Sequence, residues 1–223
     1  MSALSGSLSY ARFFAPTALP RTFLDRSHEK IVHHAMRPLS ADEPDAERSG
    51  WCVLGDPLDV SMAVGRVYLD GFVNLGFRTD RWAIPGPLLR TKVREAEAVY
   101  LEKKGRDRLG KRERAEIKEV VVRELRKKLV PSTRVVDLTW SLTEGVVRFF
   151  SHTERSTLAM TDLFQRTFGL ELVAESPYTL AERLELGDEA ARAWEGLEPT
   201  VLAPRAAVSP RAAGPHAKRG GAR

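Results

Sequence analysis

The chain has 223 residues, of which 43% are hydrophobic and 29% charged, and a formal net charge of +5; a chain of this size predicts one folded domain of about 100–200 residues plus a tail. Cys52 is the only cysteine, which excludes an internal disulfide and a cysteine-based zinc site. The longest uncharged run is the first eleven residues. Such a run is too short for a membrane-spanning helix of ~18 apolar residues and lacks the pattern of a signal peptide, so we expect a cytoplasmic protein with no membrane partner.

The first third of the chain predicts strands with one helix between them. Strands are expected at residues 8–14, 51–54 and 72–84, from apolar runs or alternating patterns, and an amphipathic helix at 21–36. The acidic residues 40–49 predict a solvated loop, and residues 58–70 favour neither helix nor strand. Trp51, Trp82 and Trp140 lie in apolar contexts and are expected to fill the core.

Residues 85–131 predict two basic helices joined by a polar turn at 105–110. Pro85-Gly86-Pro87 suits a helix start, because a first-turn proline gives up no hydrogen bond. The second helix, residues 111–129, ends before Pro131. Each helix has an apolar stripe to pack and another face to expose. The stripes are Leu89, Val93, Ala96 and Tyr100, and then Ile117, Val121, Leu125 and Leu129.

The last part of the folded region predicts a strand pair, a helix and a closing strand. Residues 134–142 and 146–151 form a predicted β-hairpin. Ser151 and Glu154 have capping-box spacing before a helix that runs to Phe168, with Gly169 as its C-terminal cap. A short strand is expected at 170–174.

These elements together predict an α+β protein. Residues 1–84 and 132–180 form the expected body of two small β-α-β-type halves, and the basic helical hairpin 85–131 is inserted between them. Residues 181–198 are assigned a C-terminal helix. The composition of residues 199–223, rich in Pro, Ala, Gly and Arg, predicts a disordered basic tail that serves either as a solubilising terminus or as an electrostatic tether.

Positive charge is concentrated in the helical pair. Between Arg90 and Arg134, 16 Lys or Arg face 8 Asp or Glu, a local net charge of +8, whereas residues 135–198 carry −7. A compact basic element predicts a polyanion partner, with nucleic acid as the first candidate. Lys and Arg would neutralise phosphates without discriminating between bases. The alternative is a solvated helix face in which glutamates such as Glu113 and Glu116 are the partners.

Three stretches resemble the bacterial recombination-associated RdgC family. They are Gly50-Trp51, residues 84–90 (IPGPLLR) and residues 111–131 (KRERAEIKEVVVRELRKKLVP), followed by a hairpin, helix and glycine over 135–169. The resemblance covers about residues 7–180. It implies an α+β body with a helical projection, sequence-independent binding to duplex DNA and restraint of recombinase loading. Within the matching motif, Arg90 occupies a basic position of the family.

The chain also departs from this family. Its members have a longer C-terminal region that helps to close a dimeric ring around DNA, and here a short tail follows. The segment 131–136 is also shorter than in the family and lacks its Phe residues. We therefore expect a short, divergent member, with a homodimer as a further candidate partner.

The function expected first is non-enzymatic: a nucleoid-associated protein that binds double-stranded DNA without sequence preference and obstructs or regulates homologous recombination. One alternative is a protein-interaction module that docks on an acidic partner. The other is a metal-dependent exonuclease, a label given to this family, although Asp137 and Glu144 are not tightly spaced. The predicted DNA-binding residues are Arg90, Lys92, Arg94, Lys103, Lys104, Arg106, Arg108, Lys111, Arg112, Arg114, Lys118, Arg123, Arg126, Lys127 and Arg134.

No cofactor or metal site is expected. Residues 105–111 have the glycine and lysine spacing of a phosphate-binding loop, but Arg112 stands where Ser or Thr would hold magnesium, and a helix precedes the loop instead of a strand. His28, His33 and His34 are close in sequence but lack the pattern of a metal site.

Overall fold

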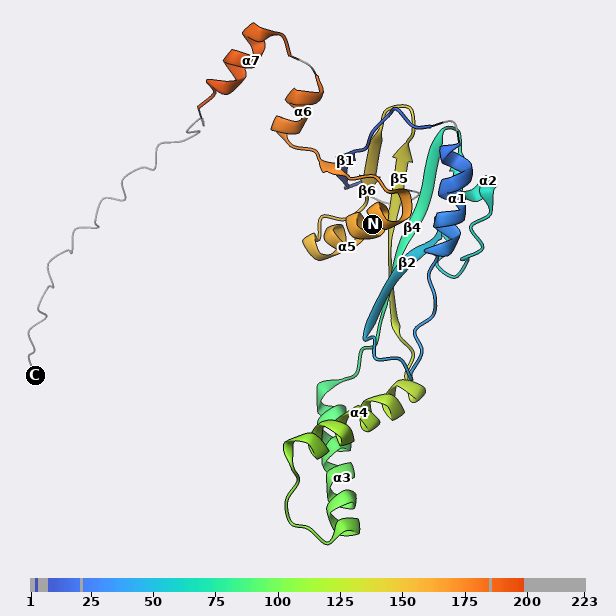
Figure 1. The fold of residues 1–223 in the computed structure, drawn as a ribbon, viewed down its shortest axis with the longest axis vertical. Coiled ribbons are helices and arrows are strands. Elements are labelled where there is room, and N and C mark those ends of the chain that lie inside the picture. Colours follow the sequence, from blue (N-terminus) through green and yellow to red (C-terminus); the bar gives the residue numbers. More distant parts are fainter. Residues whose placement is uncertain (1–2, 4–7, 21, 185, 199–223) are drawn as a thin grey trace, which may run out of the picture. The chain divides into compact units, whose positions relative to one another are not determined.

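The structure is a computed structural model that describes residues 3, 8–20, 22–184 and 186–198 (Figure 1). The predicted basic tail, residues 199–223, therefore lies outside the described residues. Contacts divide the chain into one unit of residues 1–180 and a second that begins at Ala181. The strands, the two basic helices and the core all belong to the first unit.

A single antiparallel sheet forms the body of the first unit. Its strand order is β2-β4-β5-β6-β1-β7, and β3 pairs with β4. Since β1 pairs with both β6 and β7, the two predicted halves share one sheet. The strands are β1 (Ala11–Phe14), β2 (Glu47–Val53), β3 (Tyr68–Leu69), β4 (Phe72–Arg81), β5 (Ser132–Ser141), β6 (Val146–Phe149) and β7 (Val173–Ala174).

Helices complete the fold and confirm the α+β class. In the first unit, α1 and α5 contact each other over the sheet, and α3 and α4 form a helical hairpin between β4 and β5 (Figure 1). None of the described helices is both long and apolar enough to cross a bilayer. The helices are α1 (Phe23–His33), α2 (Val64–Val67), α3 (Gly86–Lys104), α4 (Lys111–Lys128), α5 (Glu154–Phe168), α6 (Pro177–Arg183) and α7 (Asp188–Glu195).

Aromatic side chains from the sheet and α5 build the main core. The ring of Trp140 lies 5.2 Å from the rings of Phe164 and Phe168 on α5, centroid to centroid. The Trp51 indole N–H donates to Thr167 Oγ1 at 2.8 Å, so this buried polar group is satisfied. Trp51, Trp82 and Trp140 are all buried, which confirms their predicted place in the core.

Gly50 is required because the segment that follows α1 pairs closely with β2 there. The Met36 N–H donates to Trp51 O at 2.7 Å, and the Trp51 N–H donates to His34 O at 3.0 Å, which ties the end of α1 to the strand. A Cβ atom at Gly50 would lie 2.6 Å from Met36 Cα. Backbone atoms cannot yield to such a contact without a shift of the chain, so a side chain here would separate the two segments.

Several predicted boundaries are wrong. The strand β2 begins at Glu47, inside the predicted loop 40–49, because its pairing with β4 extends to Glu47 opposite Arg81. The N-cap of α5 is Thr153, not Ser151, whose hydroxyl instead accepts from the Thr153 N–H. The predicted C-terminal helix is two short helices, α6 and α7. Gly169 does cap α5, with φ 68°.

Candidate nucleic-acid interface

The two basic helices pack on each other through a small core of their own. Ile117, Val121 and Leu125 of α4 are buried there. The α3 partners include Leu89 and Tyr100, so both predicted apolar stripes are confirmed. The turn between the helices begins at Gly105, whose φ of 60° is left-handed and ends α3.

Glu113 fastens the turn of the hairpin. Its Oε2 accepts a hydrogen bond from the Gly110 N–H at 2.8 Å, which is half of a capping box. Its Oε1 accepts from the Tyr100 hydroxyl and from the Arg106 guanidinium, each at 3.2 Å. The Gly110 N–H, followed by the Tyr100 hydroxyl and the positive charge of Arg106, favours the ionised carboxyl group and lowers the pKa of Glu113.

We expect the hairpin turn to lose stability in acid through Glu113. The folded state lowers this pKa, so the carboxylate adds stability above its unfolded pKa, and that contribution disappears as the pH falls through the lowered value. Glu113→Gln should therefore lower the urea midpoint near neutral pH, but should match the wild type below the lowered pKa. Equal midpoints at both pH values would contradict this role.

One side of the helical hairpin carries an apolar groove with paired charges. The groove has a volume of about 580 Å³, and Val99 of α3 and Val120 of α4 are 50% and 57% exposed beside it. Lys92 and Lys103 lie on the same side. Lys92 Nζ is 2.7 Å from Glu95 Oε2, so this cation already has a partner.

The opposite side carries cations without partners, and we name it the basic side. Helical spacing places Arg90 and Arg94 on the flank of α3 away from the groove, one turn apart. Arg114 and Lys118, with Lys111 a further turn before, occupy the matching flank of α4. All five side chains are exposed, and none of these side chains forms a hydrogen bond or ion pair with the residues that the structure describes, although Lys118 also lines a cavity with Asp42 and Glu43.

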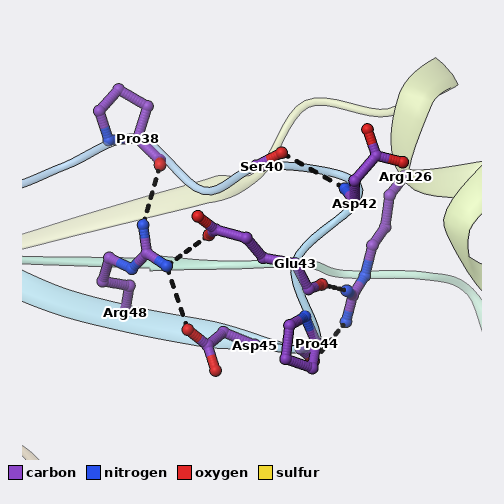
Figure 2. A network of polar contacts seen from close by, with 8 residues as sticks. All are labelled: Pro38, Ser40, Asp42, Glu43, Pro44, Asp45, Arg48 and Arg126. Carbon is purple, nitrogen blue, oxygen red and sulfur yellow. Dashed lines mark hydrogen bonds and ion pairs between the residues drawn. The ribbon is translucent and has the colours of Figure 1, made fainter.

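Arg126, also among the predicted DNA-binding residues, is not part of this surface. It is only 8% exposed, and its guanidinium donates to Glu43 O at 2.5 Å and to Pro44 O at 3.4 Å (Figure 2). The same guanidinium carbon lies 6.0 Å from the centre of the Trp82 ring. Arg126 thus anchors α4 to the loop before β2.

Arg48 holds that loop from the other side. Its guanidinium pairs with Glu43 and with Asp45, at 3.0 Å for Asp45, and donates to Pro38 O at 3.2 Å (Figure 2). Asp42 of the loop lies 3.9 Å from both Arg123 and Lys127 of α4. Sequence reasoning missed the contacts between this loop and α4, because the residues that they join are about eighty positions apart.

The other predicted cations fall into two groups. Those with partners are exposed: Arg106 beside Glu113, Arg112 beside Glu116 at 3.0 Å, and Lys104 over the Tyr100 ring at 5.9 Å. Exposed pairs of this kind contribute little, so a phosphate could replace a carboxylate partner. Arg108 is exposed in the turn, whereas Arg134 lies on β5 outside the helical hairpin.

Among the described residues, no three His, Cys, Asp or Glu side chains gather as a metal site requires. Cys52 is buried, and burial raises the pKa of its thiol to about 12. No protein-family model matches the chain, and the comparison with curated proteins gives no match either. Function is therefore inferred from the charge and geometry of the helical hairpin.

Proposed function

We propose that this protein binds double-stranded DNA without sequence preference through the basic side of the helical hairpin, and that it thereby obstructs or regulates homologous recombination without enzymatic activity. The observation that supports DNA binding is the set of five exposed, partner-free cations on one side. The resemblance to RdgC proteins supports the role in recombination. A nucleoid-associated location and a homodimer belong to the same proposal.

The spacing of the basic side suits the DNA backbone. Arg90 and Arg94 are separated by a rise of ~6 Å along α3, as are Arg114 and Lys118 along α4. Two cations on each helix would meet successive phosphates and release their counterions. Phosphate contact without base readout gives affinity that is independent of sequence.

A salt titration tests the proposal. About five phosphate contacts predict a slope near −4.5 for log K against log salt, and a loss of affinity on the order of 500-fold between about 50 and about 200 mM salt. Fluorescence anisotropy with an AT-rich and a GC-rich duplex should give the same curve. A salt-independent affinity, or a strong preference for one duplex, would refute the proposal.

Docking of a protein partner is the second candidate, and the groove side favours it. Val99 and Val120 are exposed there, between Lys92 and Lys103. The predicted acidic partner would need an apolar anchor here, because the glutamates Glu95, Glu113 and Glu116 outnumber the two lysines around the groove. This candidate predicts weak duplex binding and a complex that Val120→Asp disrupts. Strong duplex binding by the V120D variant would show that DNA binds outside the groove, as proposed for the basic side.

A further inference from the structure

A second basic site lies on the sheet, outside the helical hairpin. It is a cavity of about 440 Å³ between the ends of the long strands and the start of α5. Residues that face each other across antiparallel strands project from the same face of the sheet. Trp51 and Phe77 form such a pair, and Trp51 packs beneath α5.

This sheet face changes from apolar to polar toward the ends of the strands. Two residues from the Trp51–Phe77 pair, toward the start of β2, Ser49, Thr79 and Arg134 lie side by side on neighbouring strands. Two residues further in the same direction, Glu47, Arg81 and Ser132 form the next row. The polar rows lie where α5 begins, so the sheet there is not sealed by apolar side chains. Most of these residues line the cavity.

Three arginines from three elements meet at this cavity. Arg155 of α5 lies with its Nη2 2.7 Å from Glu47 Oε2, and Arg81 of β4 has its Nε 3.9 Å from the same oxygen. Glu47 therefore gathers two guanidinium groups beside one carboxylate. Arg134 of β5 also lines the cavity, and its side chain has no hydrogen-bond or ion-pair partner among the residues described. The lining thus carries three positive charges and one negative charge.

The remaining walls supply hydroxyl groups and apolar surface. Thr79, Ser132 and Ser156 provide hydroxyl donors, and Ile84 provides an apolar wall. Trp82 also lines the cavity, and its buried indole N–H lacks a hydrogen-bond partner within the described part of the chain. A cavity of this volume is within the range of small-ligand sites, ~300–1,000 Å³, and is larger than one phosphate ion needs.

We propose that this cavity binds a phosphate monoester, with the phosphate held by Arg134, Arg81 and Arg155 and its organic group against the apolar wall. Guanidinium groups bind phosphate oxygens through paired, charge-assisted hydrogen bonds. Glu47 is occupied by two of the arginines, so a net charge of two remains to meet the phosphate dianion. The ligand is either a free nucleotide or the 5′-phosphate at the end of a DNA strand. Neither source requires the basic side of the helical hairpin.

Binding of three probes by the full-length protein tests this site. The probes are inorganic phosphate and dTMP, measured by calorimetry, and a short duplex with a 5′-phosphate compared with its 5′-hydroxyl form. Arg134→Gln should weaken the phosphorylated probes about 10- to 100-fold, which corresponds to the loss of one charged hydrogen bond. Arg155→Gln is the second variant. Arg166→Gln, on the same helix but paired with Asp162 at 2.7 Å, is the matched control and should bind as the wild type does.

The tightest probe identifies the source: dTMP indicates a free nucleotide, and preference for the 5′-phosphorylated duplex indicates a strand end. No saturable binding of any probe, or equal binding by the wild type and R134Q, would overturn the proposal. Closed circular DNA has no strand ends, so R134Q should bind it as the wild type does. The triple variant R90Q/R94Q/K118Q should keep its dTMP affinity, which separates failure of this site from failure of the hairpin.

Discussion

Replacing Arg90, Arg94 and Lys118 together by Gln is expected to weaken duplex binding on the order of 10³-fold near 0.1 M salt. Each lost phosphate contact removes ~0.9 from the slope of log K against log salt, which is about tenfold in affinity at that salt concentration. The slope itself should become shallower by about 3. Anisotropy of a labelled duplex across a salt series measures both quantities. All three side chains are exposed, so the fold should be retained.

The matched control removes the same charge from elsewhere on the helical hairpin. It combines Lys92→Gln, Lys103→Gln and Arg112→Gln. These three side chains lie away from the basic side, and Lys92 and Arg112 are already paired with glutamates. The control variant should lose only the long-range electrostatic attraction to DNA, and should keep most of the slope of log K against log salt. Equal losses in both triple variants would mean that net charge, not the basic side, determines affinity. An unchanged affinity in the first variant would show that DNA binds elsewhere.

The local sequence pattern was sufficient to predict the helical hairpin. The apolar stripes of both helices repeat within one or two turns, and the same residues that define them form the hairpin's core. Proline and glycine mark the ends, since Pro85 precedes α3 and Gly105 ends it. Such signals depend on neighbours in the chain, so the sequence alone is enough to locate them.

Strand pairing could not be predicted from local pattern, because it joins residues that are far apart in the sequence. The continuation of β2 to Glu47 depends on Arg81 opposite it, and the apolar pattern of β2 starts only at Trp51. Likewise, alternation in residues 72–84 could not show that β4 pairs with β5 along its full length, nor that β1 lies between β6 and β7. The α+β class was predictable, whereas the single shared sheet was not.

The candidate interface was likewise only partly predictable from the sequence. Helical spacing separates Arg90 and Arg94 from Lys92. Which side carries the apolar groove depends on how α3 packs against α4, and the sequence does not show this packing. The burial of Arg126 was not predictable, because its partner is the loop at Glu43, far away in sequence. A basic helix gives no local sign that one of its cations is a buried anchor.

Arg126 offers the last test, because it should affect stability and not the DNA contact. Arg126→Leu removes two charge-assisted hydrogen bonds to Glu43 O and Pro44 O, together with the contact to the Trp82 ring. A hydrogen bond to a charged group contributes ~1.5–3 kcal/mol, and the second bond is long, so we expect a loss of about 2–3 kcal/mol in the free energy of unfolding. Urea denaturation measures it.

Arg123→Leu is the control for Arg126→Leu on the same helix. The Arg123 side chain is 52% exposed and lies 3.9 Å from Asp42, so its loss should change the free energy of unfolding by less than about 1 kcal/mol. Under conditions where both variants are folded, R126L should keep the salt slope of the wild type, because a buried guanidinium releases no counterion from DNA. If R126L instead keeps full stability but loses slope, Arg126 turns outward to contact phosphate, and the anchor seen here is broken on binding.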